Sequence, residues 1–262
     1  MRQITIGEFT MNVVEAGSGS PLVLVHGFTL DHSMWQGQID GLASQFRVIA
    51  PDLRGFGQSK SKDDVVTMAQ FADDIAALLD AMEVSEPITY CGLSMGGYIG
   101  WQFIERHRDR VAKLIQCDTK AKADTDEARA TRLKAADHVL EHGPETLITT
   151  MMPKLFADAN RSSQPDIVEA TRQVMMNTAP SAIAAAQRGM AQRPDVTNEL
   201  SKIDVPTLIL VGEHDAISPP DEMRDIAAAI PGAQFVQIDG AGHMAPLEDP
   251  QAVNNAMLAF LS

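Results

Sequence analysis

Short apolar runs alternate along the chain with longer segments of helical periodicity. Residues 2–16 alternate between apolar and polar positions around a turn at Gly7-Glu8, which predicts a β-hairpin. Six further β-prone runs predict strands: 22–25, 47–50, 88–93, 111–117, 206–211 and 234–238. The continuous apolar run 22–25 is typical of a central parallel strand covered on both faces, and 47–50 and 88–93 are also interpreted as buried strands. Helical patterns occupy the intervals between these runs, among them 34–45, 68–82 and 220–230, and a last helix at 254–261 is predicted after the final run. This order predicts an α/β fold with a mostly parallel eight-stranded sheet, right-handed crossovers and flanking helices.

The pattern changes between Lys120 and Asp195, where no strand candidate occurs. Helical patterns follow one another there, at 125–142, 145–156, 165–177 and 181–192. We expect a helical cap over the carboxyl edge of the sheet, so that the chain divides into core residues 1–118, a cap at 119–195 and core residues 196–262. Five methionines in this insertion suit a tolerant apolar pocket, with ordinary packing between helices as the alternative: Met151, Met152, Met175, Met176 and Met190.

A serine lies where the apolar run 88–93 gives way to a helical pattern. Gly92, Ser94 and Gly96 form the sequence Gly-x-Ser-x-Gly at this junction, the spacing of a nucleophile elbow. A strained turn of this kind exposes the serine hydroxyl, and its glycines let the helix pack close to the strand. The alternative is a glycine-rich helix start with Ser94 as its cap. Because strand, turn and helix are all predicted, we interpret Ser94 as a nucleophile.

A serine nucleophile needs a base that takes its proton and an acid that orients the base. Asp215 and His243 each follow a predicted strand, so both should face the sheet edge that carries Ser94. The order serine, aspartate, histidine is the one expected with such an elbow. Asp118 also ends a strand and is a competing acid, and Glu213 is a weaker candidate. We therefore predict a triad of Ser94, Asp215 and His243.

An oxyanion intermediate needs two backbone N–H donors. Met95 follows the nucleophile directly, and Phe28 lies in the loop after the strand end at His26-Gly27. We predict that these two amides form the oxyanion hole. His26 is interpreted as a structural residue that holds its loop by a ring hydrogen bond, and the turn from Asp52 to Ser59 as structural too.

The composition and charge of the chain limit which classes of molecule it is expected to bind. The chain has 262 residues and a formal net charge of −14, which argues against nucleic acids and anionic membranes because both attract clustered Lys and Arg. We find no signal peptide, no transmembrane run and no metal, phosphate-loop or dinucleotide motif, so we expect a cytoplasmic protein without a cofactor. Cys91 and Cys117 are expected to be buried thiols. Monomer and homo-oligomer fit equally well.

Several motifs together resemble the α/β-hydrolase superfamily in order and spacing: Val25-His26-Gly27-Phe28, Asp52 to Ser59, Gly92 to Gly97, Val211 to Asp215 and Gly242-His243. Within it the chain is similar to the bacterial carboxylesterase and 3-oxoadipate enol-lactonase branch, where a segment like 117–125 opens the cap. The resemblance implies an α/β-hydrolase fold. Haloalkane dehalogenases and epoxide hydrolases of this fold carry Asp at the position of Ser94. Cofactor-free perhydrolases usually carry Pro at the position of Thr29.

These observations favour a carboxylesterase that cleaves small esters through an acyl-enzyme on Ser94. One alternative is an enol-lactonase using the same triad; its anionic substrate calls for a cation under the cap, with Arg129, Arg132 and Arg188 as candidates and a solvated helix face as their ordinary role. A hydrolase of C–C bonds is a smaller alternative. A receptor that binds a ligand and turns it over slowly is another, although nothing in the sequence disables the triad.

Overall fold

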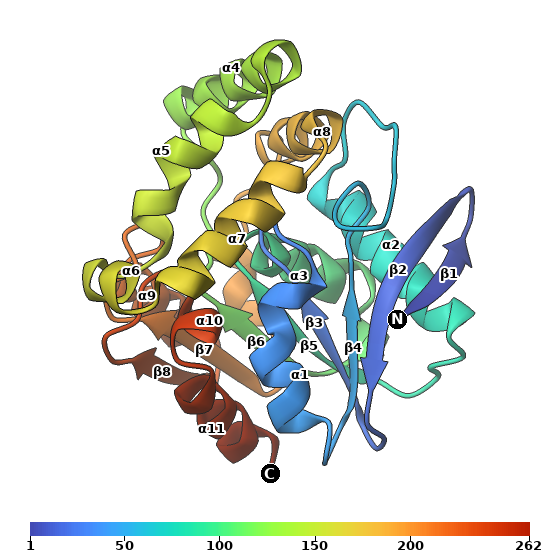
Figure 1. The fold of residues 1–262 in the computed structure, drawn as a ribbon. Helices are drawn as coiled ribbons and strands as arrows, with labels where there is room; N and C mark the ends of the chain where they lie inside the picture. Colours follow the sequence, from blue (N-terminus) through green and yellow to red (C-terminus); the bar gives the residue numbers. More distant parts are fainter.

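A computed structural model describes residues 1–262, whose strands form one sheet (Figure 1). The strands are β1 Arg2–Ile6, β2 Phe9–Ala16, β3 Pro21–Val25, β4 Arg47–Pro51, β5 Ile88–Leu93, β6 Val111–Cys117, β7 Thr207–Gly212 and β8 Gln234–Ile238. Their order across the sheet is β1-β2-β4-β3-β5-β6-β7-β8. The β1–β2 and β2–β4 pairs are antiparallel and the other pairs are parallel. The predicted eight-stranded, mostly parallel sheet is confirmed.

Helices cover both faces of this sheet (Figure 1). One face carries α1 Gln36–Leu42 and α11 Pro250–Leu261; the other carries α2 Met68–Ala81, α3 Met95–Arg106 and α9 Pro220–Ala229. Leu22 and Leu24 of β3 pack with the first group, whereas Val23 and Val25 pack with the second. Because successive side chains of a strand point to opposite faces, both faces of β3 need apolar residues. This is why the strand has a continuous apolar run.

Five helices and no strand lie between β6 and β7: α4 Asp126–His142, α5 Glu145–Leu155, α6 Asp158–Ser163, α7 Pro165–Asn177 and α8 Pro180–Met190. Figure 1 shows α4, α5, α7 and α8 gathered at one edge of the sheet. Four of the five were predicted from periodicity. The sequence of α6, DANRSS, carries no apolar stripe, so its periodicity gave no signal. No helix of the protein is both long and apolar enough to cross a bilayer.

Two helix starts differ from the predicted ones. The segment predicted to be helical from Met34 begins as a 3₁₀ turn, His32–Trp35, because the Asp31 side chain accepts a hydrogen bond from the Ser33 amide and caps it. The last helix begins at Pro250, four residues before the predicted Asn254 start. Asp249 caps it there and Pro250 occupies its first turn. A further short helix, α10 Ala245–Glu248, was not predicted.

Candidate active site

Four neighbouring strands each end in a residue that the sequence singled out. Ser94 follows β5, Asp118 follows β6, Asp215 lies in the loop after β7, and His243 lies in the loop after β8. These strands are adjacent and parallel in the sheet. Their carboxyl ends therefore meet at one edge, where ligands bind in open α/β sheets.

The turn at Ser94 has the strained geometry of an elbow. Ser94 has φ 54° and ψ −110°, a conformation that non-glycine residues rarely adopt. A Cβ atom added to Gly92 would lie 2.3 Å from the Gly96 carbonyl oxygen, and one added to Gly96 would lie 2.2 Å from the Val25 carbonyl oxygen. Both contacts are with backbone. Only glycine therefore lets α3 approach β5 and β3 this closely.

Hydrogen bonds hold the strained turn in place. The Ser94 amide donates to the Cys117 carbonyl at 3.0 Å, and the Thr119 hydroxyl donates to the Ser94 carbonyl at 2.8 Å. The Tyr90 hydroxyl donates to the Gly96 carbonyl at 2.7 Å. The surrounding β5, β6 and α3 thus fix the backbone that carries the serine.

Asp215 and His243 form a buried hydrogen-bonded pair. His243 Nδ1 lies 2.8 Å from Asp215 Oδ2, and both residues are almost fully buried. The Ser218 hydroxyl donates to the same oxygen at 2.5 Å, and the amides of Ile217 and Ser218 donate to Oδ1. Burial raises the pKa of Asp215, but the charge and hydrogen bond of His243 and the hydrogen bonds of Ser218 outweigh it and lower the pKa. Asp215 is therefore an ionised carboxylate at neutral pH.

The two competing acids make other contacts. Asp118 Oδ1 accepts a hydrogen bond from the Gly212 amide at 2.8 Å, and neither oxygen is hydrogen-bonded to His243. Glu213 accepts from the Gly240 amide at 2.8 Å and lies on the surface, beside the exposed His214. Asp215 is thus the acid in hydrogen-bond contact with the candidate base.

Ser94 and His243 line one cavity of about 90 Å³ beneath the helices that follow β6. No hydrogen bond joins their side chains, so the structure brings together the acid and the base and places the serine on the same cavity wall. Apolar side chains make up most of the remaining lining, including Phe28 and Met244 from the core and Met151, Leu155 and Met190 from α5 and α8. Two of the five methionines of the insertion, Met151 and Met190, therefore face the cavity.

The predicted oxyanion donors lie beside this cavity. Phe28 is part of its lining, and its amide makes no hydrogen bond within the protein. Met95 is the first residue of α3, where N–H groups have no intrahelical partner. The next residue of the Phe28 loop, Thr29, has a positive φ of 64°, and its carbonyl accepts a hydrogen bond from Thr178 of the segment between α7 and α8. The two candidate donors are therefore the Phe28 amide in the loop after β3 and the Met95 amide at the start of α3.

His26 and Asp52 hold the Phe28 loop. The His26 ring accepts from the Leu53 amide at Nε2, so its Nδ1 carries the proton and donates to the Gly27 carbonyl at 2.8 Å. Asp52 accepts hydrogen bonds from the amides of His32 and Gln58 and from the His32 and Asn12 side chains. These contacts match the structural roles expected for His26 and the Asp52 turn.

Of the three arginines considered for an anionic substrate, only Arg132 lines the cavity. Arg188 pairs with Asp137 on α4 instead. Asp124 binds Arg132 at 2.5 Å and the buried Arg193 at 2.7 Å. Two guanidinium groups share one carboxylate, so this cluster carries one net positive charge, and Arg132 is its member that lines the cavity.

Two groups of acids and histidines have the spacing of metal ligands: Asp31, His32 and Asp52, and Asp118, Asp215 and His243. In the first group Asp52 already accepts four protein hydrogen bonds. In the second, Asp215 and His243 are bound to each other. Among the fully buried side-chain polar atoms of these two groups, only Asp118 Oδ2 has no hydrogen-bond partner.

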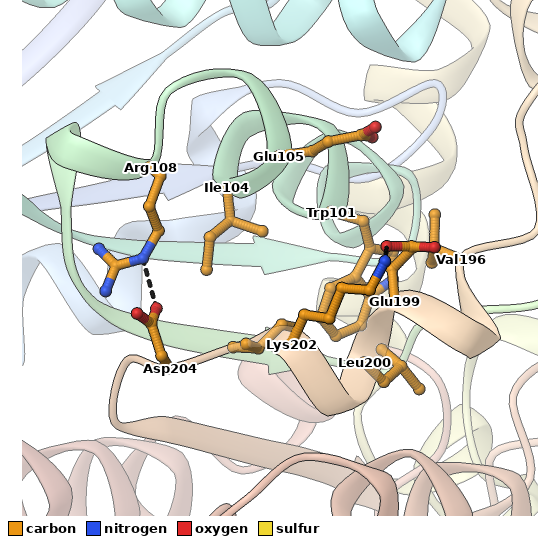
Figure 2. A pocket seen from close by; sticks show the side chains of 10 residues that line it. Trp101, Ile104, Glu105, Arg108, Val196, Glu199, Leu200, Lys202 and Asp204 are labelled. Atoms are coloured by element: carbon orange, nitrogen blue, oxygen red, sulfur yellow. Dashed lines mark hydrogen bonds and ion pairs between the residues drawn. The ribbon is translucent and has the colours of Figure 1, made fainter.

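A larger hollow of about 290 Å³ lies between α3 and the 3₁₀ turn Thr197–Lys202, and Figure 2 shows its lining. Ion pairs of Arg108 with Asp204 and of Lys202 with Glu199 border it, and Trp101 lies on its wall. None of the predicted site residues lines this hollow. This hollow is larger than the cavity lined by Ser94 and His243, so cavity size alone would not identify the candidate catalytic residues.

Two supporting residues were not predicted. Ser218 contacts both members of the buried pair, and the sequence Asp-x-x-Ser before a helix is the local signal that could have indicated it. Glu248 accepts hydrogen bonds from the Gly242 amide, the Ala157 amide and the Asn160 side chain. It ties the loop of His243 to α6, and because its partners lie up to 91 residues away, no local pattern indicates it.

Comparison with known proteins places this geometry in a family. Residues 20–250 match the family described as the alpha/beta hydrolase fold. The AB hydrolase superfamily protein YisY of Bacillus subtilis (strain 168) is 31% identical over 260 residues, covering 96% of this chain and 95% of the relative. The 3-oxoadipate enol-lactonase 1 of Acinetobacter baylyi is 29% identical, covering 88% of this chain and 84% of the relative.

A thermophilic esterase from Thermogutta terrifontis, solved with malate bound, is similar over nearly its whole length. Its TM-score is 0.97 at 43% sequence identity, with 99% of this chain and 97% of the esterase covered. The extent of these matches and the eight-stranded sheet with its elbow show that the chain belongs to the α/β hydrolase family.

Proposed function

We propose that this protein is a serine carboxylesterase that cleaves esters of small substrates. The observation that carries the proposal is the shared cavity, in which the strained Ser94 faces the same space as a His243 bound to Asp215. A base oriented by a buried carboxylate and a serine exposed on an elbow are the components of nucleophilic acyl transfer. The similarity to a thermophilic esterase supports the same reaction class.

The reaction follows from these roles. Ser94 Oγ attacks the acyl carbon while His243 Nε2 takes the hydroxyl proton, and the amides of Phe28 and Met95 stabilise the oxyanion. His243 returns the proton to the departing alcohol, which leaves an acyl group on Ser94. Water then attacks the acyl carbon by the same route and releases the acid.

The test is hydrolysis of p-nitrophenyl esters from acetate to octanoate by the wild type and by Ser94→Ala. We expect wild-type turnover that falls by several orders of magnitude in the variant, because the nucleophile is lost. Ser33→Ala is the matched control, since the exposed Ser33 hydroxyl only donates a hydrogen bond to the Asp31 side chain. Absence of wild-type turnover would contradict the proposal, and tight ligand binding without turnover would favour a receptor.

A second candidate is opening of a lactone or cleavage of an ester that carries a free carboxylate. The net positive charge at Arg132 on the cavity wall favours it, because an anionic substrate would find a counter-charge there. One relative is an enol-lactonase, and the similar esterase was solved with malate, a dicarboxylate. The triad and the oxyanion donors would act as above.

Arg132→Gln tests this second candidate. For p-nitrophenyl esters of a dicarboxylic acid with one free carboxylate, we expect kcat/KM to fall by about ten-fold or more, the size of a lost charge-assisted hydrogen bond. For p-nitrophenyl butyrate the change should be small. Arg129→Gln is the matched control, since Arg129 lies on the same helix and does not line the cavity. Equal losses on charged and neutral esters would contradict recognition of an anion.

A further inference from the structure

Asp118 is a fully buried carboxyl group that the proposed reaction does not use. Its Oδ1 accepts one hydrogen bond, from the Gly212 amide, and its Oδ2 has no partner. No lysine or arginine forms an ion pair with it, and the titratable groups around it are Asp215, His243 and the thiols of Cys117 and Cys91. A buried carboxylate with so few donors is costly to ionise.

The position of Asp118 relative to the candidate triad is fixed. Its backbone has an unusual positive φ of 47°, and its amide donates to the Leu210 carbonyl at 2.9 Å. Together with the Gly212 contact, this ties Asp118 to β7 at two points, directly before the loop of Asp215. One oxygen of Asp118, one oxygen of Asp215 and one nitrogen of His243 lie within 4.8 Å of one another.

Two buried carboxylates this close do not both ionise, so the pair keeps one proton. Asp215 accepts four hydrogen bonds, one of them from His243, whereas Asp118 accepts one. The negative charge is therefore better stabilised on Asp215 and the proton on Asp118. Burial is the largest cause that raises the pKa of Asp118, followed by the charge of Asp215.

We propose that Asp118 is a positioning residue that holds a proton beside Asp215 and supplies the negative charge for His243 when Asp215 cannot. The inference rests on the proposed roles of Ser94, Asp215 and His243. When Asp215 is replaced by a neutral residue, the repulsion between the carboxyl groups disappears. The positive charge of a protonated His243, whose ring nitrogen lies within 4.8 Å of an Asp118 oxygen, then offsets the cost of burial, so Asp118 gives up its proton and becomes the counter-ion of the imidazolium.

The first test is a double-mutant cycle of Asp118→Asn and Asp215→Asn. The two readouts are p-nitrophenyl acetate hydrolysis and the rate at which a fluorophosphonate labels Ser94, each measured as a function of pH. In the wild-type background, Asp118→Asn should cost little, about three-fold, because it replaces one neutral group by another. In the Asp215→Asn background the same change should cost about ten-fold or more, because the last negative charge near His243 is lost.

The acid limb is the pH range in which the rates of hydrolysis and labelling rise as His243 loses its proton. If Asp118 had only a structural role, its replacement would not shift this limb. It should stay close to its wild-type position in either single variant, since one negative charge remains. In the double variant it should move to lower pH, because an imidazolium without a counter-ion loses its proton more readily. Equal costs of Asp118→Asn in both backgrounds, or a shift to lower pH in Asp118→Asn alone, would overturn the proposal.

Infrared spectroscopy reads the proton directly and needs no activity. The wild type at neutral pH should show the carbonyl band of a buried protonated carboxyl group. This band should be absent from Asp118→Asn and also from Asp215→Asn, where Asp118 is ionised. Its persistence in Asp215→Asn would overturn the proposal. Circular dichroism checks folding, and Asp118→Ser replaces Asp118→Asn if the latter does not fold.

These measurements separate the two hypotheses. A wild type that neither hydrolyses esters nor reacts with the fluorophosphonate contradicts the proposed function, and the infrared band still reports where the proton lies. A wild type that reacts, with variants that show no coupling, contradicts the role of Asp118 alone.

Discussion

Single residues at the elbow decide how closely three elements can meet. Gly96 is the clearest case, because an added Cβ would contact only backbone, chiefly the Val25 carbonyl oxygen at 2.2 Å and the His26 carbonyl oxygen at 3.0 Å. Backbone at the end of β3 cannot move aside as a flexible side chain can. The same segment leads into the loop that presents the Phe28 amide, so steric strain at Gly96 is transmitted to a candidate oxyanion donor.

We therefore expect Gly96→Ala to impair both stability and activity. Overpacking of this kind costs about 1–3 kcal/mol of unfolding free energy, more than the helix propensity that alanine gains. Displacement of the Phe28 loop should lower kcat on p-nitrophenyl acetate by on the order of 100-fold. Denaturant unfolding and steady-state kinetics measure the two effects.

Gly143→Ala provides the comparison. Gly143 has a positive φ of 81° with no atom within 4 Å of an added Cβ, so alanine there strains only the local backbone, by about 1 kcal/mol. Its kcat should match that of the wild type. If Gly96→Ala also kept wild-type kcat, the proposed link between the elbow and the oxyanion loop would be wrong.

At the scale of elements, one buried carboxylate joins the loop of His243 to the helices between β6 and β7. Glu248 at the end of α10 accepts from the Gly242 amide at 2.8 Å, the Ala157 amide at 2.9 Å and the Asn160 side chain at 2.7 Å. Gly242 directly precedes His243, and Asn160 lies in α6. The position of the candidate base is thus coupled to the helices between β6 and β7.

Glu248→Gln should loosen this connection. Glutamine offers one acceptor oxygen where three N–H groups converge, and its own NH₂ faces a donor, so we expect a loss of about 1–3 kcal/mol of unfolding free energy. We expect kcat to fall with it, because the loop of His243 is less well held. Glu222→Gln is the control: its ion pair with Lys120 is partly exposed and worth little. Similar losses in both variants would contradict a special role for Glu248.

Elements with strong periodicity were predictable, and those built from distant contacts were not. The strands and the helices α2, α5, α7 and α8 follow from apolar spacing, because that spacing is set by the surface each element buries. Helix α9 was predicted with the help of Pro220 at its first turn. Helix α6 has no apolar stripe and is held by contacts such as that of Asn160 with Glu248. Such contacts join residues far apart in sequence, and no local pattern records them.

The same distinction holds for the site across the whole molecule. Ser94, Asp215 and His243 were located because strand ends of a parallel sheet share one edge, so topology turns sequence order into proximity. The sharing of Asp124 between Arg132 and Arg193 was not predicted, since it depends on how α4 and the segment after α8 pack. The sequence left Asp118 and Asp215 as competing acids. The structure distinguishes them, because Asp215 is hydrogen-bonded to His243 whereas Asp118 accepts only from the Gly212 amide.

Stability of the whole chain should depend on pH through Asp52. Burial raises the pKa of Asp52, but hydrogen bonds from His32 and Gln58 outweigh it and lower the pKa from an ordinary 3.8 to about 2. The folded value lies below the unfolded one, so the contribution is complete above about pH 4 and is lost as pH falls towards 2. The size of the shift corresponds to about 2 kcal/mol. Asp52→Asn should therefore destabilise the protein by about that amount at pH 7, and the difference from the wild type should vanish near pH 2.

Urea unfolding from neutral to acid pH measures this difference, with Asp204→Asn as the control. Asp204 pairs with Arg108 at an exposed surface, where an ion pair contributes little to stability, so its variant should follow the wild-type curve. The acid sensitivity of the fold is then assigned to the turn that holds the Phe28 loop. A constant difference between Asp52→Asn and the wild type at every pH would show instead that the lost contacts do not depend on ionisation. The hydrogen bonds of Asp52 would then stabilise the turn by geometry alone.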